Sequence, residues 1–176
     1  MLIIQDKCRR CIFLLNKYDF ADFIILRSKL LNQPVTNLKL QKILYFLNAI
    51  YLVKRGEPLV DAVFEKWAYG PTIPAIYKEY RVNGGNNIID IKPHPILYFE
   101  DNYFKVKKHK FDLADIDQDA QDFINQYLPQ LLRFDQFELV DYAKRETQWH
   151  WKNDKNYSND LTRKFYQDPA HDFWKI

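Results

Sequence analysis

Apolar residues dominate the segment from Thr36 to Gly56, and their spacing is that of a helix. One broad face of this helix carries Leu40, Ile43, Leu44, Leu47, Ile50 and Tyr51. Further apolar side chains at positions 45, 46, 49, 52 and 53 extend that face almost around the whole cylinder. A helix that is apolar on nearly all sides is expected at the centre of a bundle. Thr36 or Asn37 suits its N-cap, and the basic last turn before Gly56 is typical of a helix end.

Weaker patterns on both sides of this helix predict the remaining elements. Helical spacing starts near Asp19, where Asp19 or Asp22 can cap the helix, and stops at Gln33-Pro34. Pro71 is predicted to open another helix, and Pro129 to kink or shorten the helix in which it lies. The other expected elements are a strand over 60–67, a hairpin of 96–100 and 103–107 around Asp101-Asn102, and helices over 115–131, 134–146 and 160–166.

Together these elements predict a mainly α-helical fold with a small antiparallel β-element, an α+β domain that is compact around its central buried helix. A chain of 176 residues, of which 47% are hydrophobic, is long enough for one ordinary core. Glycine and asparagine at 83–87 mark a flexible linker. We expect an N-terminal extension over 1–18, a domain over 19–152 and a C-terminal tail over 153–176.

Charge and composition narrow the class of partner only slightly. The formal charge of +3 comes from 26 basic and 23 acidic residues, which is far below the footprint of a typical nucleic-acid-binding domain. No run approaches the roughly 18 apolar residues that span a bilayer, and the N-terminus lacks the order of a secretory signal. We therefore expect a cytoplasmic protein without a membrane partner. In that compartment Cys8 and Cys11 are interpreted as reduced thiols, although CRRC also resembles a redox or metal motif.

Trp67-Ala68-Tyr69-Gly70-Pro71 is the most distinctive short motif. Trp67 and Tyr69 alternate along the expected strand, so their rings should share one side, while Gly70 and Pro71 redirect the chain. Two interpretations stay open at this stage. The rings pack into the core, or Trp67, Tyr69, Tyr77 and Trp149 border a surface that anchors another protein.

Residues that could support catalysis or bind a cofactor do not form a recognisable pattern. No nucleophile and base, and no glycine-rich phosphate loop, occur at a useful spacing. The four histidines show no metal-ligand spacing and are expected at the surface: His94, His109, His150 and His171. The acidic residues at 115, 117 and 119 are interpreted as helix caps. Lys39, Gln41 and Lys42 are expected to be solvated or to support a turn. We therefore expect no enzyme activity, no cofactor and no metal site.

Two segments together resemble the Panacea domain of SocA-like antitoxins, a domain of phage-associated proteins. The first is TNLKLQKILYF, with Leu40 and Gln41, and the second is FEKWAYGPTIPAIYKEY, with Gly70 and Pro71 in its turn. The resemblance extends over about 19–149, so the central segment is interpreted as a Panacea-like domain. Near its end the family pattern has a Thr-His-x-Glu group ahead of a Trp. Glu146 and Trp149 match that pattern here, whereas the Thr and His are absent.

The resemblance implies an antitoxin that neutralises a cognate toxin, encoded by the adjacent gene, through direct protein–protein contact. It leaves open delivery of the toxin to a cellular protease, and a homo-oligomer. The alternative is a nucleic-acid-binding or regulatory protein of a phage or mobile element, which would use the basic segment from Lys105 to Lys110. The small net charge disfavours nucleic acid as the partner. The lysines also have a structural explanation, because lysine on the edge of a strand prevents aggregation.

Overall fold

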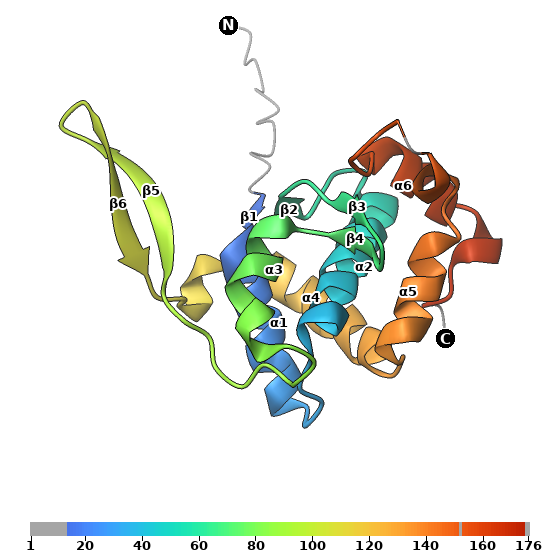
Figure 1. The fold of residues 1–176 in the computed structure, drawn as a ribbon, viewed down its shortest axis with the longest axis horizontal. Coiled ribbons are helices and arrows are strands. Elements are labelled where there is room, and N and C mark those ends of the chain that lie inside the picture. Colours follow the sequence, from blue (N-terminus) through green and yellow to red (C-terminus); the bar gives the residue numbers. More distant parts are fainter. Residues whose placement is uncertain (1–13, 152, 175–176) are drawn as a thin grey trace, which may run out of the picture.

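The computed structural model describes residues 14–151 and 153–174, and it is built around one central helix. Helix α2 (Asn37–Arg55) contacts five other helices: α1 (Lys17–Leu30), α3 (Pro74–Tyr80), α4 (Gln118–Leu132), α5 (Gln136–Lys144) and α6 (Asn159–Tyr166) (Figure 1). The predicted central position of α2 is thus confirmed. None of the helices within the described ranges combines the length and the apolarity that crossing a bilayer requires.

Both predicted ends of α2 are confirmed by their capping geometry. The Thr36 hydroxyl accepts a hydrogen bond from the Lys39 backbone N–H, which satisfies one of the free donors of the first turn. At the other end Gly56 adopts a left-handed conformation with φ of 82°, and its N–H donates to the Leu52 carbonyl. Local signals in the sequence therefore set the length of this helix.

Within the described residues three two-stranded sheets complete the fold, and the predicted class, mainly α with a small antiparallel β-element, is confirmed. Strand β1 (Leu15–Asn16) pairs in parallel with β2 (Val60–Asp61), and β3 (Glu65–Trp67) pairs antiparallel with β4 (Gly70–Thr72). The expected single strand over 60–67 is therefore wrong, because its two ends pair with different partners. The longest pair is the hairpin of β5 (His94–Glu100) and β6 (Tyr103–His109), which projects from the helical body (Figure 1).

Three predicted details of the helices are wrong or incomplete. Helix α1 is capped by Asn16, whose side chain accepts from the Tyr18 N–H, while Asp19 and Asp22 are buried. Pro71 lies in β4, and Pro74 opens α3, because a proline at the first helical position loses no intrahelical hydrogen bond. Helix α4 continues through Pro129 to Leu132, so the proline does not shorten it. The buried side chains around Pro129 hold this last turn against the core: Leu128, Leu131 and Leu132.

The C-terminal residues contribute to the core. Helix α6 lies against α2, and Tyr166 and Trp174 are almost completely buried. Phe46 of α2 makes edge-to-face contacts with the rings of Tyr166 and Phe173. The division of the chain at residues 18 and 152 stays a prediction, but residues 159–174 pack as part of the same helical body (Figure 1). In the part of the chain that the structure describes, short 3₁₀ helices connect the larger elements: η1 (Arg81–Asn83), η2 (Leu113–Asp115), η3 (Thr147–His150) and η4 (Pro169–His171).

A buried polar network joins α2 to the C-terminal segment. The Glu146 side chain is inaccessible to solvent and accepts hydrogen bonds from the Tyr45 hydroxyl and, at 2.6 Å, from the Gln148 amide. Thr162 of α6 lies in the same network, 2.9 Å from the Tyr45 oxygen. Burial raises the pKa of the Glu146 carboxyl, and the hydrogen bonds that it accepts partly oppose this shift. The network satisfies polar groups that would otherwise be costly inside the core.

Candidate protein-binding surface

The four aromatic residues that the sequence singled out lie close together at one end of the helical body. We call Trp67, Tyr69, Tyr77 and Trp149 the aromatic cluster. The rings of Trp67 and Tyr77 meet edge to face, with centroids 4.9 Å apart. The indole N–H of Trp149 donates to the Trp67 carbonyl over 3.4 Å. The cluster therefore joins β3, α3 and η3, which are far apart in the chain.

Exposure separates the members of the aromatic cluster. Tyr69 exposes 58% of its surface and Tyr77 exposes 39%, whereas Trp67 and Trp149 are half-buried. The Lys144 ammonium lies 5.0 Å from the centroid of the Trp149 ring and 5.9 Å from that of Tyr69. This arrangement combines both interpretations of the motif, because the tryptophans support the fold and the tyrosines offer accessible rings. A rigid, partly exposed aromatic surface is the usual form of a protein-binding anchor.

A hollow of about 340 Å³ lies beside the exposed rings. Trp67, Tyr69 and Tyr77 line one part of it, and the first turn of α2 lines another. Trp149 is not among the residues that line this hollow, and it contacts Trp67 through the hydrogen bond to the Trp67 carbonyl. The remaining lining residues are Asn37, Leu38, Gln41, Ala68, Thr72, Arg81 and Gly84. Its mainly apolar rings and few polar groups suit the side chain of a partner protein.

A tight turn between β3 and β4 presents Tyr69. Trp67 pairs with Gly70 in the sheet, so Ala68 and Tyr69 form the two-residue turn. The prediction that Tyr69 lies in a strand is therefore wrong. Gly70 has φ of +84°, a left-handed conformation that side chains with a Cβ rarely adopt. A Cβ at Gly70 would also lie 3.3 Å from the Lys42 ammonium. The glycine is therefore required by both the backbone and its surroundings.

Two polar residues of α2 form hydrogen bonds with the backbone that follows this turn. Lys42 is completely buried and its ammonium donates to the Pro71 carbonyl. Gln41 is also buried, and its side-chain oxygen accepts from the Ile73 N–H at 2.9 Å. Of the two alternatives expected for these residues, a solvated side chain is wrong for Lys42 and Gln41, whereas the support of a turn is confirmed for both. Leu40 and Gly70 are buried as well. The motif residues Leu40 and Gln41 on α2 and Gly70 and Pro71 in β4 therefore lie where these two elements meet.

Replacing Gly70 by alanine should lower the free energy of unfolding by about 1–2 kcal/mol, because the left-handed conformation costs that much for a residue with a Cβ. Urea denaturation followed by circular dichroism measures the change. Gly85→Ala is the matched control, since Gly85 has no positive φ and no atom lies within 4 Å of the position that its new Cβ would take. Equal losses in the two variants would show that the turn geometry is not required.

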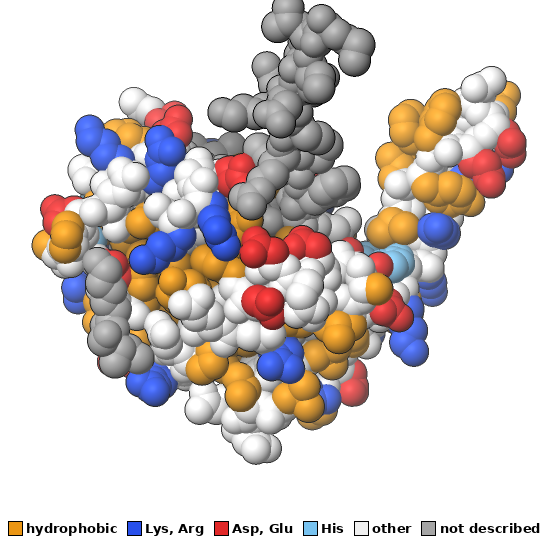
Figure 2. All heavy atoms as spheres, turned by 180° about the vertical axis from the view of Figure 1, so that it is seen from behind, with side chains coloured by type: hydrophobic (Ala, Val, Ile, Leu, Met, Phe, Trp, Pro, Cys, Tyr) orange, Lys and Arg blue, Asp and Glu red, His pale blue; other side chains and the backbone are white. Residues whose placement is uncertain are grey.

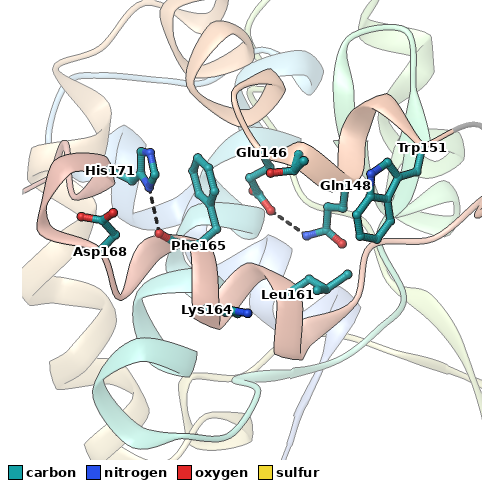
Figure 3. A pocket seen from close by; sticks show the side chains of 9 residues that line it. Glu146, Gln148, Trp151, Leu161, Lys164, Phe165, Asp168 and His171 are labelled. Carbon is teal, nitrogen blue, oxygen red and sulfur yellow. Dashed lines mark hydrogen bonds between the residues drawn. The ribbon is translucent and has the colours of Figure 1, made fainter.

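A second hollow, of about 350 Å³, lies on the C-terminal segment (Figure 3). Figure 3 shows Glu146 and Gln148 at one side of it, joined by their hydrogen bond. Opposite them the His171 ring stacks on Phe165 at 3.8 Å, and its Nδ1 donates to the Phe165 carbonyl. The hydrogen bonds drawn in this hollow join Glu146 to Gln148 and His171 to the Phe165 carbonyl. Neither of them pairs a nucleophile with a base.

The lysines of the projecting hairpin do not form one basic stripe. Lys105 forms ion pairs of 2.9 Å with Glu100 and Asp101, and Lys107 lies over the Tyr98 ring. Lys108 pairs with Pro95 and therefore points to the opposite face of the hairpin. That face also carries four exposed apolar side chains: Leu97, Phe99, Phe104 and Val106. Figure 2 shows hydrophobic side chains along the hairpin. This arrangement is poorly suited to following a phosphate backbone.

Their scatter in the sequence predicted that all four histidines lie at the surface. This prediction is wrong for His94, which is buried. His94 exposes only 1% of its side chain and lies directly opposite His109 in the hairpin. Both imidazoles face Asp19 of α1. The predicted hairpin contained the necessary signal, because extending its register by two residues at each open end places His94 opposite His109. Cys8 and Cys11 lie outside the described residues.

Comparison with known proteins identifies relatives of this architecture. The family model described as antitoxin SocA-like, Panacea domain, matches residues 40–150. These residues include most of α2, the β3–β4 turn and the whole aromatic cluster. Antitoxin SocA of Caulobacter vibrioides (strain NA1000 / CB15N) is 40% identical over 70 residues, which are 40% of this chain and 37% of that relative. The chain therefore spans little more than a third of that protein. No solved structure matches the chain significantly.

Proposed function

Since the chain belongs to the family of SocA-like antitoxins with a Panacea domain, we propose that it neutralises a cognate toxin by binding it directly. The similarity to antitoxin SocA supports the general role. The toxin is expected to be the product of the adjacent gene, and both proteins to act in the cytoplasm. The chain would then act by contact and without catalysing a reaction.

The observation that carries this proposal is the aromatic cluster on the domain that the family model matches. Its exposed tyrosines border the hollow beside the first turn of α2. The half-buried Trp67 holds Tyr77 in place through an edge-to-face contact. A surface whose rings are already fixed loses little side-chain entropy on binding. We therefore place the toxin contact at Trp67, Tyr69 and Tyr77, with Trp149 as the support beneath them.

Neutralisation would be steric, because a bound antitoxin covers the surface or pocket that the toxin needs. A protein docked on the aromatic cluster would also cover the β3–β4 turn, which Lys42 and Gln41 hold rigid. A rigid surface of this kind suits inhibition by occupation of a site. Delivery of the toxin to a protease would require a further binding surface, which the aromatic cluster alone does not supply.

The test is co-expression of the full chain with the product of the adjacent gene. We expect the neighbour to arrest growth alone, growth to be restored by this chain, and the two proteins to co-purify. A harmless neighbour that does not co-purify would overturn the proposal. Binding to DNA or RNA that weakens steeply with salt would then favour the nucleic-acid alternative and the hairpin lysines.

A further inference from the structure

Three side chains from separate parts of the chain converge at the base of the hairpin. His94 begins β5, His109 ends β6, and Asp19 lies in the first turn of α1. One ligand atom from each lies within 4.8 Å of the other two. We call these three residues the His–Asp cluster. It lies apart from the aromatic cluster and is not part of the surface assigned to the toxin.

Buried polar atoms of the His–Asp cluster lack hydrogen-bond partners among the described residues. These atoms are Asp19 Oδ1 and His94 Nε2. They face each other at 3.4 Å, too far for a good hydrogen bond and close enough to share an ion. Buried polar groups are rarely left unpaired, because each one has lost its hydrogen bonds to water without gaining others. Two such atoms directed at one point indicate a ligand between them.

The spacing of the donor atoms fits a tetrahedral metal site. Asp19 Oδ1 lies 3.4 Å from His94 Nε2 and also 3.4 Å from His109 Nε2. Ligands bound at 2.0–2.1 Å in a tetrahedron are separated by about 3.3–3.4 Å along each edge. Asp115 Oδ2 is engaged in hydrogen bonds with His109 Nε2 at 2.9 Å and with the Asp112 N–H at 2.6 Å, so the fourth position is left to a solvent molecule. Two imidazoles with a carboxylate oxygen form a donor set that suits Zn²⁺.

Further residues pack around the second ring nitrogen of His94. Asp22 Oδ2 lies 3.7 Å from this nitrogen, Nδ1, which is beyond hydrogen-bond distance, while Nε2 faces Asp19. The Tyr80 hydroxyl donates to the second oxygen of Asp22. The Tyr18 ring stacks on the imidazole with centroids 4.6 Å apart. A carboxylate behind a histidine that is itself held in place is the common outer shell of zinc sites.

We propose that His94, His109 and Asp19 bind one Zn²⁺ ion, with a solvent molecule at the fourth position, and that this ion fastens the hairpin to α1. The hairpin projects from the helical body (Figure 1), and His94 and His109 at its base face Asp19 of α1. A metal at this position crosslinks residues 19, 94 and 109. The expectation of no metal site rested on spacing along the sequence, which does not report ligands paired across two strands.

The experiment measures zinc bound by the full-length chain after dialysis against a chelator and then against buffer. Isothermal titration with Zn²⁺ should show one equivalent, and Mg²⁺, which prefers octahedral oxygen ligands, should not bind. Zn²⁺ at about 100 times its Kd should raise the Tm by about 5–10 °C. Co²⁺ in place of Zn²⁺ should produce the strong visible absorption of tetrahedral coordination.

Variants separate this site from other zinc-binding residues. His109→Ala removes a partly exposed ligand, so the variant should still fold. Loss of an outer-shell partner weakens metal affinity by roughly 10–100-fold, and loss of this direct ligand should weaken zinc affinity by more than that. His150→Ala is the matched histidine control and should bind zinc unchanged. A Cys8→Ser, Cys11→Ser double variant should also keep one equivalent. The proposal is overturned if the wild type binds no zinc, if His109→Ala binds it equally well, or if the cysteine variant loses it.

Discussion

Replacing Trp67 by alanine should weaken the complex with the cognate toxin by about 2–4 kcal/mol, a rise in Kd of about 30- to 1,000-fold. Trp67 is the central member of the aromatic cluster, since it contacts Tyr77 by its ring and Trp149 through its carbonyl. Its removal takes away one wall of the hollow and frees the Tyr77 ring. Isothermal titration or surface plasmon resonance with the purified toxin measures the loss.

Loss of affinity must be separated from loss of structure. Tyr69→Ala supports the comparison, because this exposed turn residue can be removed without opening the core. It should reduce affinity while leaving the Tm unchanged. Trp151→Ala is the matched tryptophan control, since Trp151 is 44% exposed and lies outside the cluster. If Trp67→Ala and Tyr69→Ala bind normally, or a hairpin variant such as Phe104→Ser loses binding instead, the proposed surface is wrong.

Glu146→Ala should lower the free energy of unfolding by about 3 kcal/mol, because it leaves buried donors without an acceptor. Tyr45 and Gln148 both donate to this carboxyl, and the Thr162 hydroxyl lies 3.3 Å from it. These residues belong to α2, η3 and α6, so the change also loosens the C-terminal segment from the central helix. Urea denaturation should show a lower midpoint, and thermal unfolding a Tm lower by about 6–12 °C.

Glu100→Ala is the matched control for this prediction, because its ion pair with Lys105 is exposed and should contribute less than about 1 kcal/mol. Glu146→Gln tests the electrostatic part. The raised pKa of Glu146 means that its stabilising contribution is present below its ordinary value of 4.5 and is lost as the pH rises through the folded value. The wild type should therefore lose stability relative to Glu146→Gln as the pH is raised. An unchanged midpoint in Glu146→Ala would show that the network is dispensable.

Much of the secondary structure follows from short-range signals. Thr36 and Gly56 bound α2 because one caps free N–H groups and the other adopts a left-handed conformation. Asp101-Asn102 turns the hairpin, and both residues have positive φ, as this turn requires. The predicted elements that failed depended on distant partners. Residues 60–67 are split because Val60 pairs with Leu15 while Trp67 pairs with Gly70.

The candidate protein-binding surface could be named from sequence only in part. The WAYGP motif and its resemblance to a known family singled out Trp67, Tyr69, Tyr77 and Trp149, and the structure brings these residues together, while their contact with a partner stays a prediction. The depth of each ring was not predictable. An aromatic residue has the same helical or strand pattern in a core and at an interface, so exposure is decided by what packs against it.

By itself the sequence determined the central helix, the mainly α-helical class and the family, because capping, periodicity and motif are properties of neighbouring residues. Only the tertiary structure decided that Lys42 and Glu146 are buried, that Tyr69 is presented on a turn, and that His94 and His109 face Asp19. Those outcomes depend on contacts between residues that are far apart in the chain. A buried polar group is stable only where such a contact supplies its partner, and no local pattern records that partner.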